Sequence, residues 1–445
     1  MVAAPNPNGG KAMKFARSLL LTIFLIGGAS LAGAQEPTPV GHPEQLGFSA
    51  TRLQRLTQAY QGYVDRGELP GAVLLVAVGD KIAYLHAIGF QDREKKIPMK
   101  TDAIFRLASM TKPVVSVAAM TLVEEGKLDL DAPVSQYLPE FADLKVGVET
   151  TDPATGKPTL RLEPQKRPMI VQDLLRHTAG LVYGQFGDHL VHQAYRAANV
   201  SDRDETLAQM VTKLSKIPLA HQPGEVWEYS MAVDVLGRVI EVVSGMDLDR
   251  FIAERVTGPL HMTATDFYVH QADLSRLAEA QPDAAGQPPS LPDVTKKPVR
   301  FSGGGGLVSS AADYLRFCEM LLNSGEYDGV RVLAPHMVAL MTSDALPPGV
   351  GYSERATTTT GDIAPTPAMG QGFGLGFAVR TAPGRNPEPG SVGNFYWTGA
   401  WGTTFWVDPA EKLIAMQMIQ VPLAEGGRYR RAFRNLVYQA MVSPE

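Results

Sequence analysis

The stretch Arg106-Leu-Ala-Ser-Met-Thr-Lys-Pro113 places Ser109 and Lys112 three residues apart at the start of an expected helix. Side chains three residues apart on a helix lie on one face, with Cβ atoms roughly 5–6 Å apart. A serine hydroxyl is a poor nucleophile until a neighbouring base takes its proton, and a desolvated lysine can be that base. The spacing therefore indicates a nucleophile beside its base. A Ser-x-x-Lys pattern alone is common, so the interpretation depends on partners elsewhere in the chain.

Strand-like segments occur at both ends of the chain. Residues 71–78 and 81–88 are β-rich runs separated by Gly79-Asp80, which is a hairpin signal. Further strands are expected near the C-terminus at 374–379, 394–397, 403–407 and 413–419, before a helix over 426–441. The middle, from 128 to about 322, has mainly helical periodicity. We therefore predict an α/β (α+β) fold in which N- and C-terminal segments form one antiparallel sheet flanked by helices.

The predicted organisation follows from these elements. Residues 35–127 and 370–445 form the α/β part, and 128–369 form a mainly helical insertion. Within the insertion, residues 345–370 are rich in Pro, Gly and Thr, and a loop of this length is usually functional or mobile. We expect this loop to be a flap.

The first 34 residues predict a signal peptide. Lys11, Lys14 and Arg17 precede the apolar run 19–26, and small residues end in Ala32-Gly-Ala34. This pattern is typical of a secretory signal cleaved after Ala34, and the run is shorter than the roughly 20 residues that span a bilayer. We therefore expect a secreted or periplasmic protein with no stable membrane anchor after cleavage.

Composition narrows the classes of partner. The chain has 445 residues and a formal net charge of −5, so its overall charge argues against nucleic acid as a partner. Cys318 is the only cysteine, and its apolar helical setting favours packing over nucleophilic chemistry. The nine histidines show no His-Glu-x-x-His pattern, so no metal and no cofactor is expected.

Four further segments are candidates for partners of Ser109. Tyr229 lies between a Pro-Gly turn and an apolar helix, and residues 303–306 are four consecutive glycines that permit tight backbone. Gly399 interrupts a strand at Trp397-Thr-Gly-Ala400, which indicates close approach of a ligand or backbone. His177 precedes Gly180, and we favour a structural role over a Ser-His triad because Lys112 already fills the base position.

Together these segments resemble the serine β-lactamase and penicillin-binding superfamily in its class C-like branch, and most closely the family VIII carboxylesterases. Ser109-Met-Thr-Lys112 matches the first motif of that superfamily. Tyr229-Ser-Met231 stands where class C enzymes have Tyr-x-Asn, and Trp397-Thr-Gly399 stands where they have Lys-Thr-Gly. The resemblance covers nearly the whole chain after about Leu69 and implies a β-lactamase-like fold.

The two departures bear on the substrate. The resemblance implies that the second-motif Asn and the third-motif Lys hold the amide and carboxylate of β-lactams, and this chain has Met231 and Trp397 instead. An indole cannot pair with a carboxylate as an ammonium does, and a thioether is a weak acceptor. A substrate pocket of Met231, Trp397, Thr398 and Gly399 therefore favours neutral carboxylic esters, with short to medium acyl chains. Arg428, Arg430 and Arg431 could restore an anion site, which keeps a β-lactamase or a D-Ala-type peptidase or amidase as the alternative.

The resemblance also implies a mechanism. Ser109 attacks the ester carbonyl, Lys112 and Tyr229 act as a hydrogen-bonded pair that takes its proton, and the N–H groups of Ser109 and Ala400 stabilise the oxyanion. Whether Lys112 or Tyr229 is the general base stays open, as do the physiological substrate and the oligomeric state. A non-catalytic cell-wall scaffold is a third reading, and the intact Ser109, Lys112 and Tyr229 set disfavours it.

Overall fold

The computed structural model describes residues 38–282, 289, 291–354, 364–421 and 423–442. The predicted signal peptide, residues 1–34, lies outside the described residues, as do 355–363 of the predicted flap. In the described part, no helix is long and apolar enough to cross a membrane.

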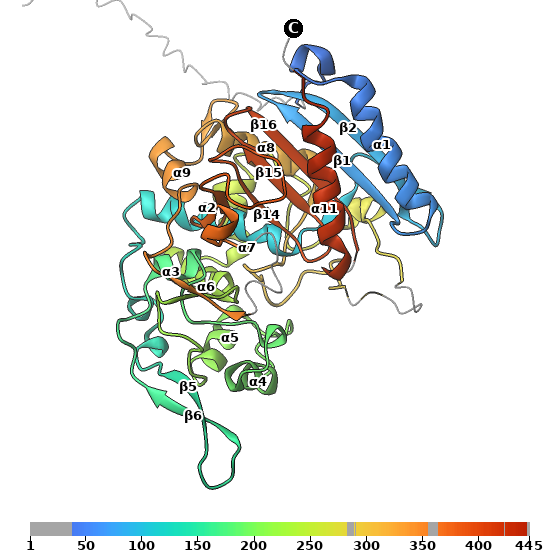
Figure 1. The fold of residues 1–445 in the computed structure, drawn as a ribbon. Helices are drawn as coiled ribbons and strands as arrows, with labels where there is room; N and C mark the ends of the chain where they lie inside the picture. Colours follow the sequence, from blue (N-terminus) through green and yellow to red (C-terminus); the bar gives the residue numbers. More distant parts are fainter. Residues whose placement is uncertain (1–37, 283–288, 290, 355–363, 422, 443–445) are drawn as a thin grey trace, which may run out of the picture. The chain divides into compact units, whose positions relative to one another are not determined.

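An eight-stranded antiparallel sheet unites the two ends of the chain. Its strand order is β12-β13-β14-β15-β16-β1-β2-β3, so C-terminal β16 pairs directly with N-terminal β1 (Figure 1). The strands are β1 Gly71–Val78, β2 Lys81–Asp92, β3 Ile97–Pro98, β12 Gln371–Phe373, β13 Ala378–Arg380, β14 Phe395–Thr398, β15 Thr404–Asp408 and β16 Leu413–Met418. This arrangement confirms the predicted fold class.

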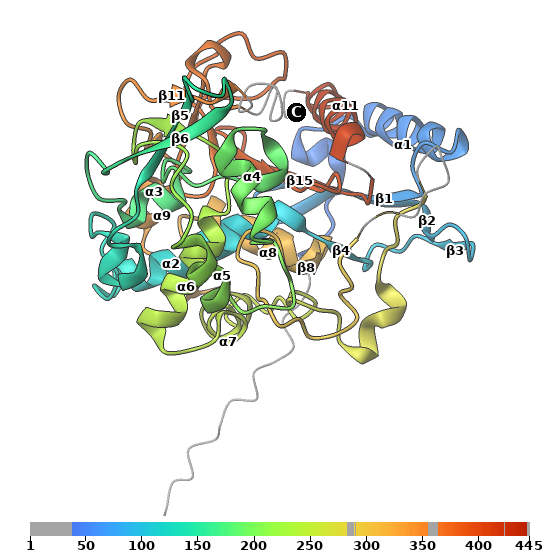
Figure 2. The ribbon, with the colours of Figure 1, turned by 90° about the horizontal axis from the view of Figure 1, so that it is seen from below.

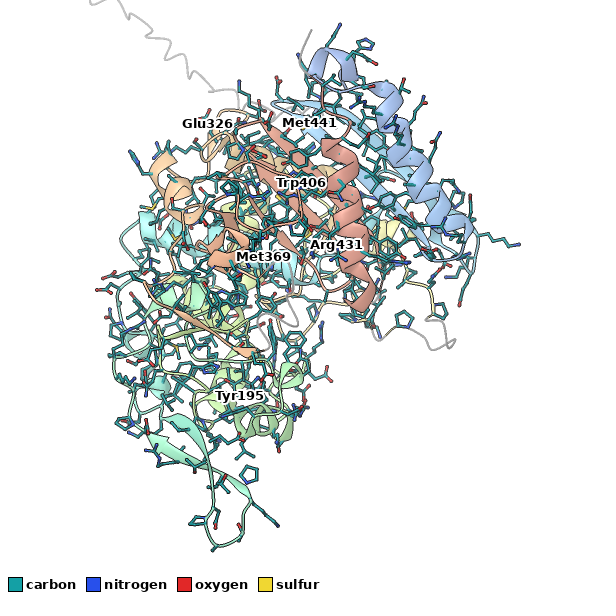
Figure 3. All side chains as sticks on the ribbon, viewed as in Figure 1. Tyr195, Glu326, Met369, Trp406, Arg431 and Met441 are labelled. Carbon is teal, nitrogen blue, oxygen red and sulfur yellow. The ribbon has the colours of Figure 1, made fainter. Side chains whose placement is uncertain are left out.

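Helices cover the sheet. α1 and α11 pack side by side over β2 and β16, and α8 packs against β1, β15 and β16 (Figure 1). Because both faces are covered, β1 is a continuous apolar run that is buried over nearly its whole length. Trp406 on β15 packs edge-on against Phe433 of α11, with ring centroids 5.3 Å apart (Figure 3). The helices are α1 Ala50–Asp65, α2 Thr111–Glu124, α3 Val171–Leu175, α4 Leu190–Ala197, α5 Leu207–Leu214, α6 Ala232–Ser244, α7 Leu248–Ile252, α8 Ala311–Leu322, α9 Pro335–Met341 and α11 Leu423–Tyr438.

The region between the sheet segments is mainly helical, as predicted. Helices α2, α3, α5 and α7 pack against α6 (Figure 2), and the β5–β6 hairpin projects from the helical region (Figure 1). Four two-stranded pairs accompany the helices: β4 Ile104–Arg106 with β8 Val308–Ser310, β5 Val146–Thr151 with β6 Pro158–Glu163, β7 Val226–Trp227 with β11 Gly351–Tyr352, and β9 Glu326–Tyr327 with β10 Val330–Arg331.

One predicted strand is wrong. Residues 374–379 were expected to form a strand, but 374–377 make the connection between β12 and β13. Gly376 has a φ of 100°, which L side chains rarely adopt, and a Cβ there would lie 2.4 Å from Ser116 Oγ. The glycines therefore turn the chain where α2 passes close to it.

Candidate active site

The turn carrying Ser109 is held against residues 307–310. β4 pairs with β8 directly before it, and the Leu107 N–H donates to Leu307 O at 2.9 Å. The next residue, Ala108, has a φ of 46°, and Ser109 lies in a 3₁₀ turn, Ala108–Met110, that leads into α2. A non-glycine residue with left-handed backbone is strained and persists only where its surroundings fix it. This geometry presents Ser109 at the head of α2, as the sequence predicted.

Lys112 is the centre of the polar network. Its Nζ lies 3.3 Å from Ser109 Oγ, 3.0 Å from Tyr183 Oη and 2.7 Å from Gly304 O. The side chain is 1% exposed, so these contacts replace water. Lys112 Nζ donates to Gly304 O and Tyr183 Oη, and it lies within hydrogen-bond distance of the Ser109 hydroxyl, whose proton a base must take. The predicted nucleophile and base are therefore brought together.

Tyr229 lies beside this network but differs from the expected hydrogen-bonded partner. The Lys112 Nζ lies over the Tyr229 ring, 4.6 Å from its centroid, and Tyr229 Oη is buried without a hydrogen-bond partner among the described residues. A cation over a tyrosine face is an attractive contact, but it leaves the hydroxyl free.

Tyr183 takes the place expected for Tyr229, and the sequence analysis missed it. Burial raises the pKa of its phenol well above the usual range, and the Tyr229 and Asp234 charges add to this. Its ring also lies near that of Tyr229, with centroids 5.5 Å apart. The available signal was a tyrosine three residues after Gly180, which is too common a pattern to single out a site residue.

The predicted oxyanion donors are the backbone N–H groups of Ser109 and Ala400. Ala400 follows β14 and lines the same cavity as Ser109, and its N–H donates no hydrogen bond to any described group. A Cβ on Gly399 would lie 2.3 Å from Leu107 O and 2.1 Å from Thr403 Oγ1. Only glycine fits there, which supports the prediction that Gly399 marks a close backbone approach.

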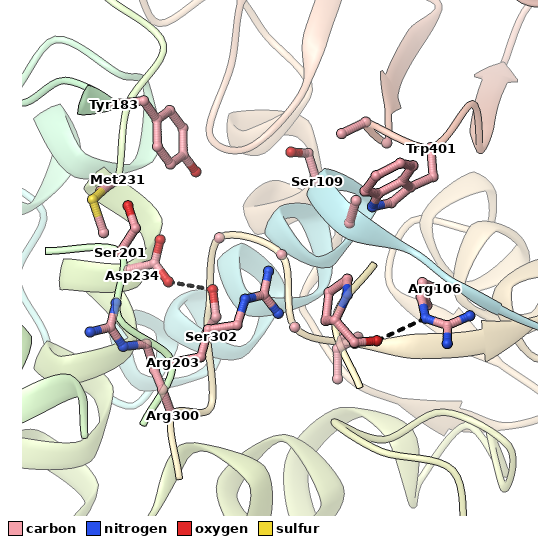
Figure 4. Close-up of a pocket in the computed structure, with 18 of the residues that line it drawn as sticks. Arg106, Ser109, Tyr183, Ser201, Arg203, Met231, Asp234, Arg300, Ser302 and Trp401 are labelled. Carbon is pink, nitrogen blue, oxygen red and sulfur yellow. Dashed lines mark hydrogen bonds between the residues drawn. The ribbon is translucent and has the colours of Figure 1, made fainter. Parts of the chain in front are cut away.

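Ser109, Tyr183, Tyr229 and Ala400 line one cavity of about 370 Å³ (Figure 4). Its lining includes the four residues expected to form the substrate pocket: Met231, Trp397, Thr398 and Gly399. Trp397 is only 1% exposed and packs against Tyr229 and Phe373, with ring centroids 5.3 Å away in both cases. The Trp397 indole is therefore part of the packed cavity wall beside Thr398. It is not positioned as a hydrogen-bond donor to a substrate.

The structure favours the structural role for His177. Its Nδ1 lies 3.3 Å from Ser230 Oγ, and its ring packs against those of Trp227, Tyr229 and Phe373. Burial holds the pKa of His177 well below its usual range, and the nearby Lys112 charge lowers it further. The imidazole is thus held neutral in an aromatic cluster behind Tyr229.

The expected C-terminal anion site does not form at the cavity. Arg428, Arg430 and Arg431 belong to α11, on which Figure 3 labels Arg431, and none of them lines the cavity. Arg428 pairs with Glu68 at 2.7 Å, and Arg430 lies 3.6 Å from Glu388. Helix α11 covers the sheet, so its arginines bind acidic groups on the covering layer.

Two other expectations concern Cys318 and metals. Cys318 is fully buried in α8, and burial raises the pKa of its thiol, so it packs as a small apolar side chain. Across the residues that the structure describes, no group of three or more His, Cys, Asp or Glu side chains could hold a metal ion.

Known proteins are similar to this chain in sequence and in fold. A family model described as Beta-lactamase matches residues 56–439. Protein Rv1367c of Mycobacterium tuberculosis is 39% identical over 368 residues, covering 80% of this chain and 87% of that protein. Esterase EstB of Burkholderia gladioli is 31% identical over 417 residues, covering 88% of this chain and 96% of EstB.

A solved structure of a hydrolase is also similar to this chain in fold and sequence. EstCE1, described as a hydrolase with promiscuous acyltransferase activity, superposes with a TM-score of 0.71 at 30% identity. The match covers 89% of this chain and 99% of EstCE1. The chain therefore belongs to the beta-lactamase family, as a hydrolase of the beta-lactamase fold whose relatives include esterases.

Proposed function

We propose that this protein hydrolyses carboxylic esters with short to medium acyl chains through an acyl-enzyme on Ser109. The observation that carries the proposal is the position of Lys112 Nζ, 3.3 Å from Ser109 Oγ and shielded from water. A buried amine at this distance can take the hydroxyl proton as the oxygen attacks. A cavity of about 370 Å³ suits small acyl and alcohol groups.

The steps follow from the arrangement of these groups. Ser109 Oγ attacks the ester carbonyl while its proton moves to Lys112, and the N–H groups of Ser109 and Ala400 donate to the developing oxyanion. Tyr229, whose hydroxyl has no partner among the described residues, protonates the departing alcohol. Water then attacks the acyl carbonyl and gives its proton to the Tyr229 oxygen, while Lys112 returns the first proton to Ser109 Oγ as the carboxylic acid leaves. Tyr183 keeps Lys112 in place by its hydrogen bond of 3.0 Å.

Esters are favoured over β-lactams and peptides by the cavity wall. Trp397 supplies no ammonium for a substrate carboxylate, and Met231 supplies no amide for a substrate amide. The printed names of EstB and EstCE1, an esterase and a hydrolase, support the same substrate chemistry.

The test compares three substrates on one preparation: 4-nitrophenyl butyrate, a chromogenic cephalosporin and a D-Ala-D-Ala peptide. Ester turnover that is lost in Ser109→Ala, with little hydrolysis of the other two, is the expected result. Cephalosporin or peptide turnover that exceeds ester turnover would instead favour the penicillin-recognising alternative. Ester turnover that survives in Ser109→Ala would remove Ser109 from the mechanism.

Export remains part of the proposal. The basic start, apolar run and Ala-x-Ala pattern before residue 35 support a cleaved signal peptide. N-terminal sequencing of protein recovered from the periplasm or medium should begin at Gln35, whereas a retained Lys14 to Ala34 segment would contradict cleavage.

A further inference from the structure

The active-site cavity carries an unusual set of charges for an acidic protein. Among the described residues that line it, the charged side chains are three arginines and one aspartate, although the whole chain has a formal net charge of −5. Arg203, Arg300 and Asp234 lie together with Ser302 on the side of the cavity across from Ser109 and Trp401 (Figure 4). Two of the three arginines that line the cavity therefore lie across from the nucleophile, and Arg106 lies near Trp401 (Figure 4).

Two of the arginines, Arg106 and Arg300, bind backbone carbonyls and a carboxylate of the protein. Arg106 donates to the carbonyls of Pro292 and Ala278, at 3.1 Å each. Arg300 donates to Val200 O at 2.8 Å and lies 3.9 Å from Glu205. Both are nearly buried, so their hydrogen bonds hold loops around the cavity.

Arg203 is different. It is exposed, it lines the cavity, and it makes no hydrogen bond or ion pair with any residue that the structure describes. The Asp234 carboxylate acts on Arg203 through its charge, but it is buried and accepts a hydrogen bond from Ser302 Oγ at 2.6 Å. Asp234 therefore attracts Arg203 without binding it.

A free guanidinium in a cavity is suited to one class of partner. It presents five N–H donors in a planar fork that matches the two oxygens of a carboxylate. Cavity walls displace part of the water that would otherwise screen the charge, which strengthens such a contact. The ester carbonyl itself would still lie among neutral groups, beside Trp397 and Met231.

We propose that Arg203 binds a carboxylate on the substrate, so that the preferred esters carry an acidic group away from the scissile bond. This inference rests on the proposed ester hydrolysis at Ser109 and adds the substrate class. The acidic group can belong to the acyl half, as in monoesters of dicarboxylic acids, or to the alcohol half. A neutral ester lacks this contact and is the slower substrate.

Two matched pairs of esters test the proposal. The acyl pair is 4-nitrophenyl adipate monoester and its neutral adipamate analogue, and the alcohol pair is 4-carboxyphenyl butyrate and 4-carbamoylphenyl butyrate. We expect the wild-type kcat/KM to favour the acidic member of one pair by about 10-fold or more, since one charge-assisted hydrogen bond changes affinity about 10–100-fold. The pair that shows the preference identifies the half of the substrate that carries the acid.

Variants then assign the effect to Arg203. Arg203→Gln should remove the preference by lowering kcat/KM for the acidic ester about 10–100-fold, with the neutral ester changed less than about 3-fold. Arg203→Lys should retain part of the preference. Arg161→Gln, on the exposed β5–β6 hairpin, is the matched control and should leave all four rates unchanged.

The outcomes separate this inference from the function on which it rests. If the wild type hydrolyses the neutral esters through Ser109 but shows no preference in either pair, or if Arg203→Gln slows both members equally, the carboxylate site is wrong and ester hydrolysis stands. If no ester is hydrolysed, both proposals fall.

Discussion

Two groups of polar side chains in the active site differ in how their hydrogen bonds are satisfied. Around Lys112, Ser109 Oγ, Tyr183 Oη and Gly304 O all lie within 3.3 Å of one nitrogen. Tyr229 Oη and the Arg203 guanidinium, in contrast, have no hydrogen-bond partner among the described residues. The bonded groups fix the geometry of the nucleophile, and the unbonded ones are available to the substrate. Buried polar groups normally find partners, so the buried Tyr229 hydroxyl without one indicates where a ligand belongs.

Substitution of Lys112 is the most direct way to remove the hydrogen bonds around Ser109. Lys112→Met keeps the length of the side chain but leaves Ser109, Tyr183 and Gly304 without their shared partner. We expect kcat for 4-nitrophenyl butyrate to fall about 10³–10⁴-fold, near the upper range for loss of a general base. Steady-state kinetics measure the loss, and circular dichroism checks that the fold survives. A loss below 10-fold would show that another group takes the proton.

A second prediction concerns Trp397, which lines the cavity but is buried in its wall. Trp397→Lys recreates the Lys-Thr-Gly sequence yet places an ammonium where the indole packs on Tyr229 and Phe373. We expect the free energy of unfolding to fall by about 3–5 kcal/mol, as for loss of a large buried aromatic, without a gain of cephalosporin hydrolysis.

Trp401 is the matched control for this substitution. It lines the same cavity but is only partly buried, so Trp401→Lys should change the free energy of unfolding by about 1 kcal/mol or less. Urea denaturation of both variants measures the difference. Equal losses would mean that Trp397 is not part of the packed wall.

The two tyrosines sharpen the comparison between bonded and unbonded groups. Tyr229→Phe removes the free hydroxyl that we assign to the leaving alcohol, so kcat should fall about 10²–10³-fold. Tyr183→Phe removes one hydrogen bond to Lys112, worth about 1 kcal/mol, so the loss should be nearer 5-fold.

A leaving-group series supports the assignment of these roles. Tyr229→Phe should be most damaging for alkyl esters, whose alcohols need a proton to depart, and least damaging for 4-nitrophenyl esters. Tyr183→Phe should slow both ester types equally. The reverse pattern would exchange the roles of the two tyrosines.

The smallest effect is the dependence of stability on pH. Burial holds the pKa of His177 well below 6.5, so below that pH the unfolded chain binds a proton that the folded protein does not. Stability from this residue is therefore complete above pH 6.5 and falls as the pH drops, by up to about 1.4 kcal/mol per unit.

Urea midpoints at pH 7.5 and 5.5 test this prediction. The wild type should lose more stability on acidification than His177→Gln, because the variant has no imidazole to protonate. An identical loss in the two proteins would assign the effect to other groups.

Sequence patterns anticipated the sheet, its terminal strands and the Ser109–Lys112 pair, because periodicity and helix spacing are local properties. They missed Tyr183 and Arg203, which reach the cavity from loops that only the folded chain brings near Ser109. They left open an anion site at the arginines of α11, because the sequence does not show that Glu68 and Glu388 pair with Arg428 and Arg430. The number of arginines in the sequence does not show which of them form ion pairs within the protein and which do not.

The central claim is that Ser109 carries the acyl group between the two half-reactions. Intact-mass spectrometry of the protein mixed briefly with 4-nitrophenyl butyrate and quenched in acid tests this directly. We predict a mass increase of one butyryl group, mapped by peptide analysis to Ser109 and absent in Ser109→Ala. Rapid ester turnover with no adduct on Ser109, or with the acyl group on another residue, would contradict it.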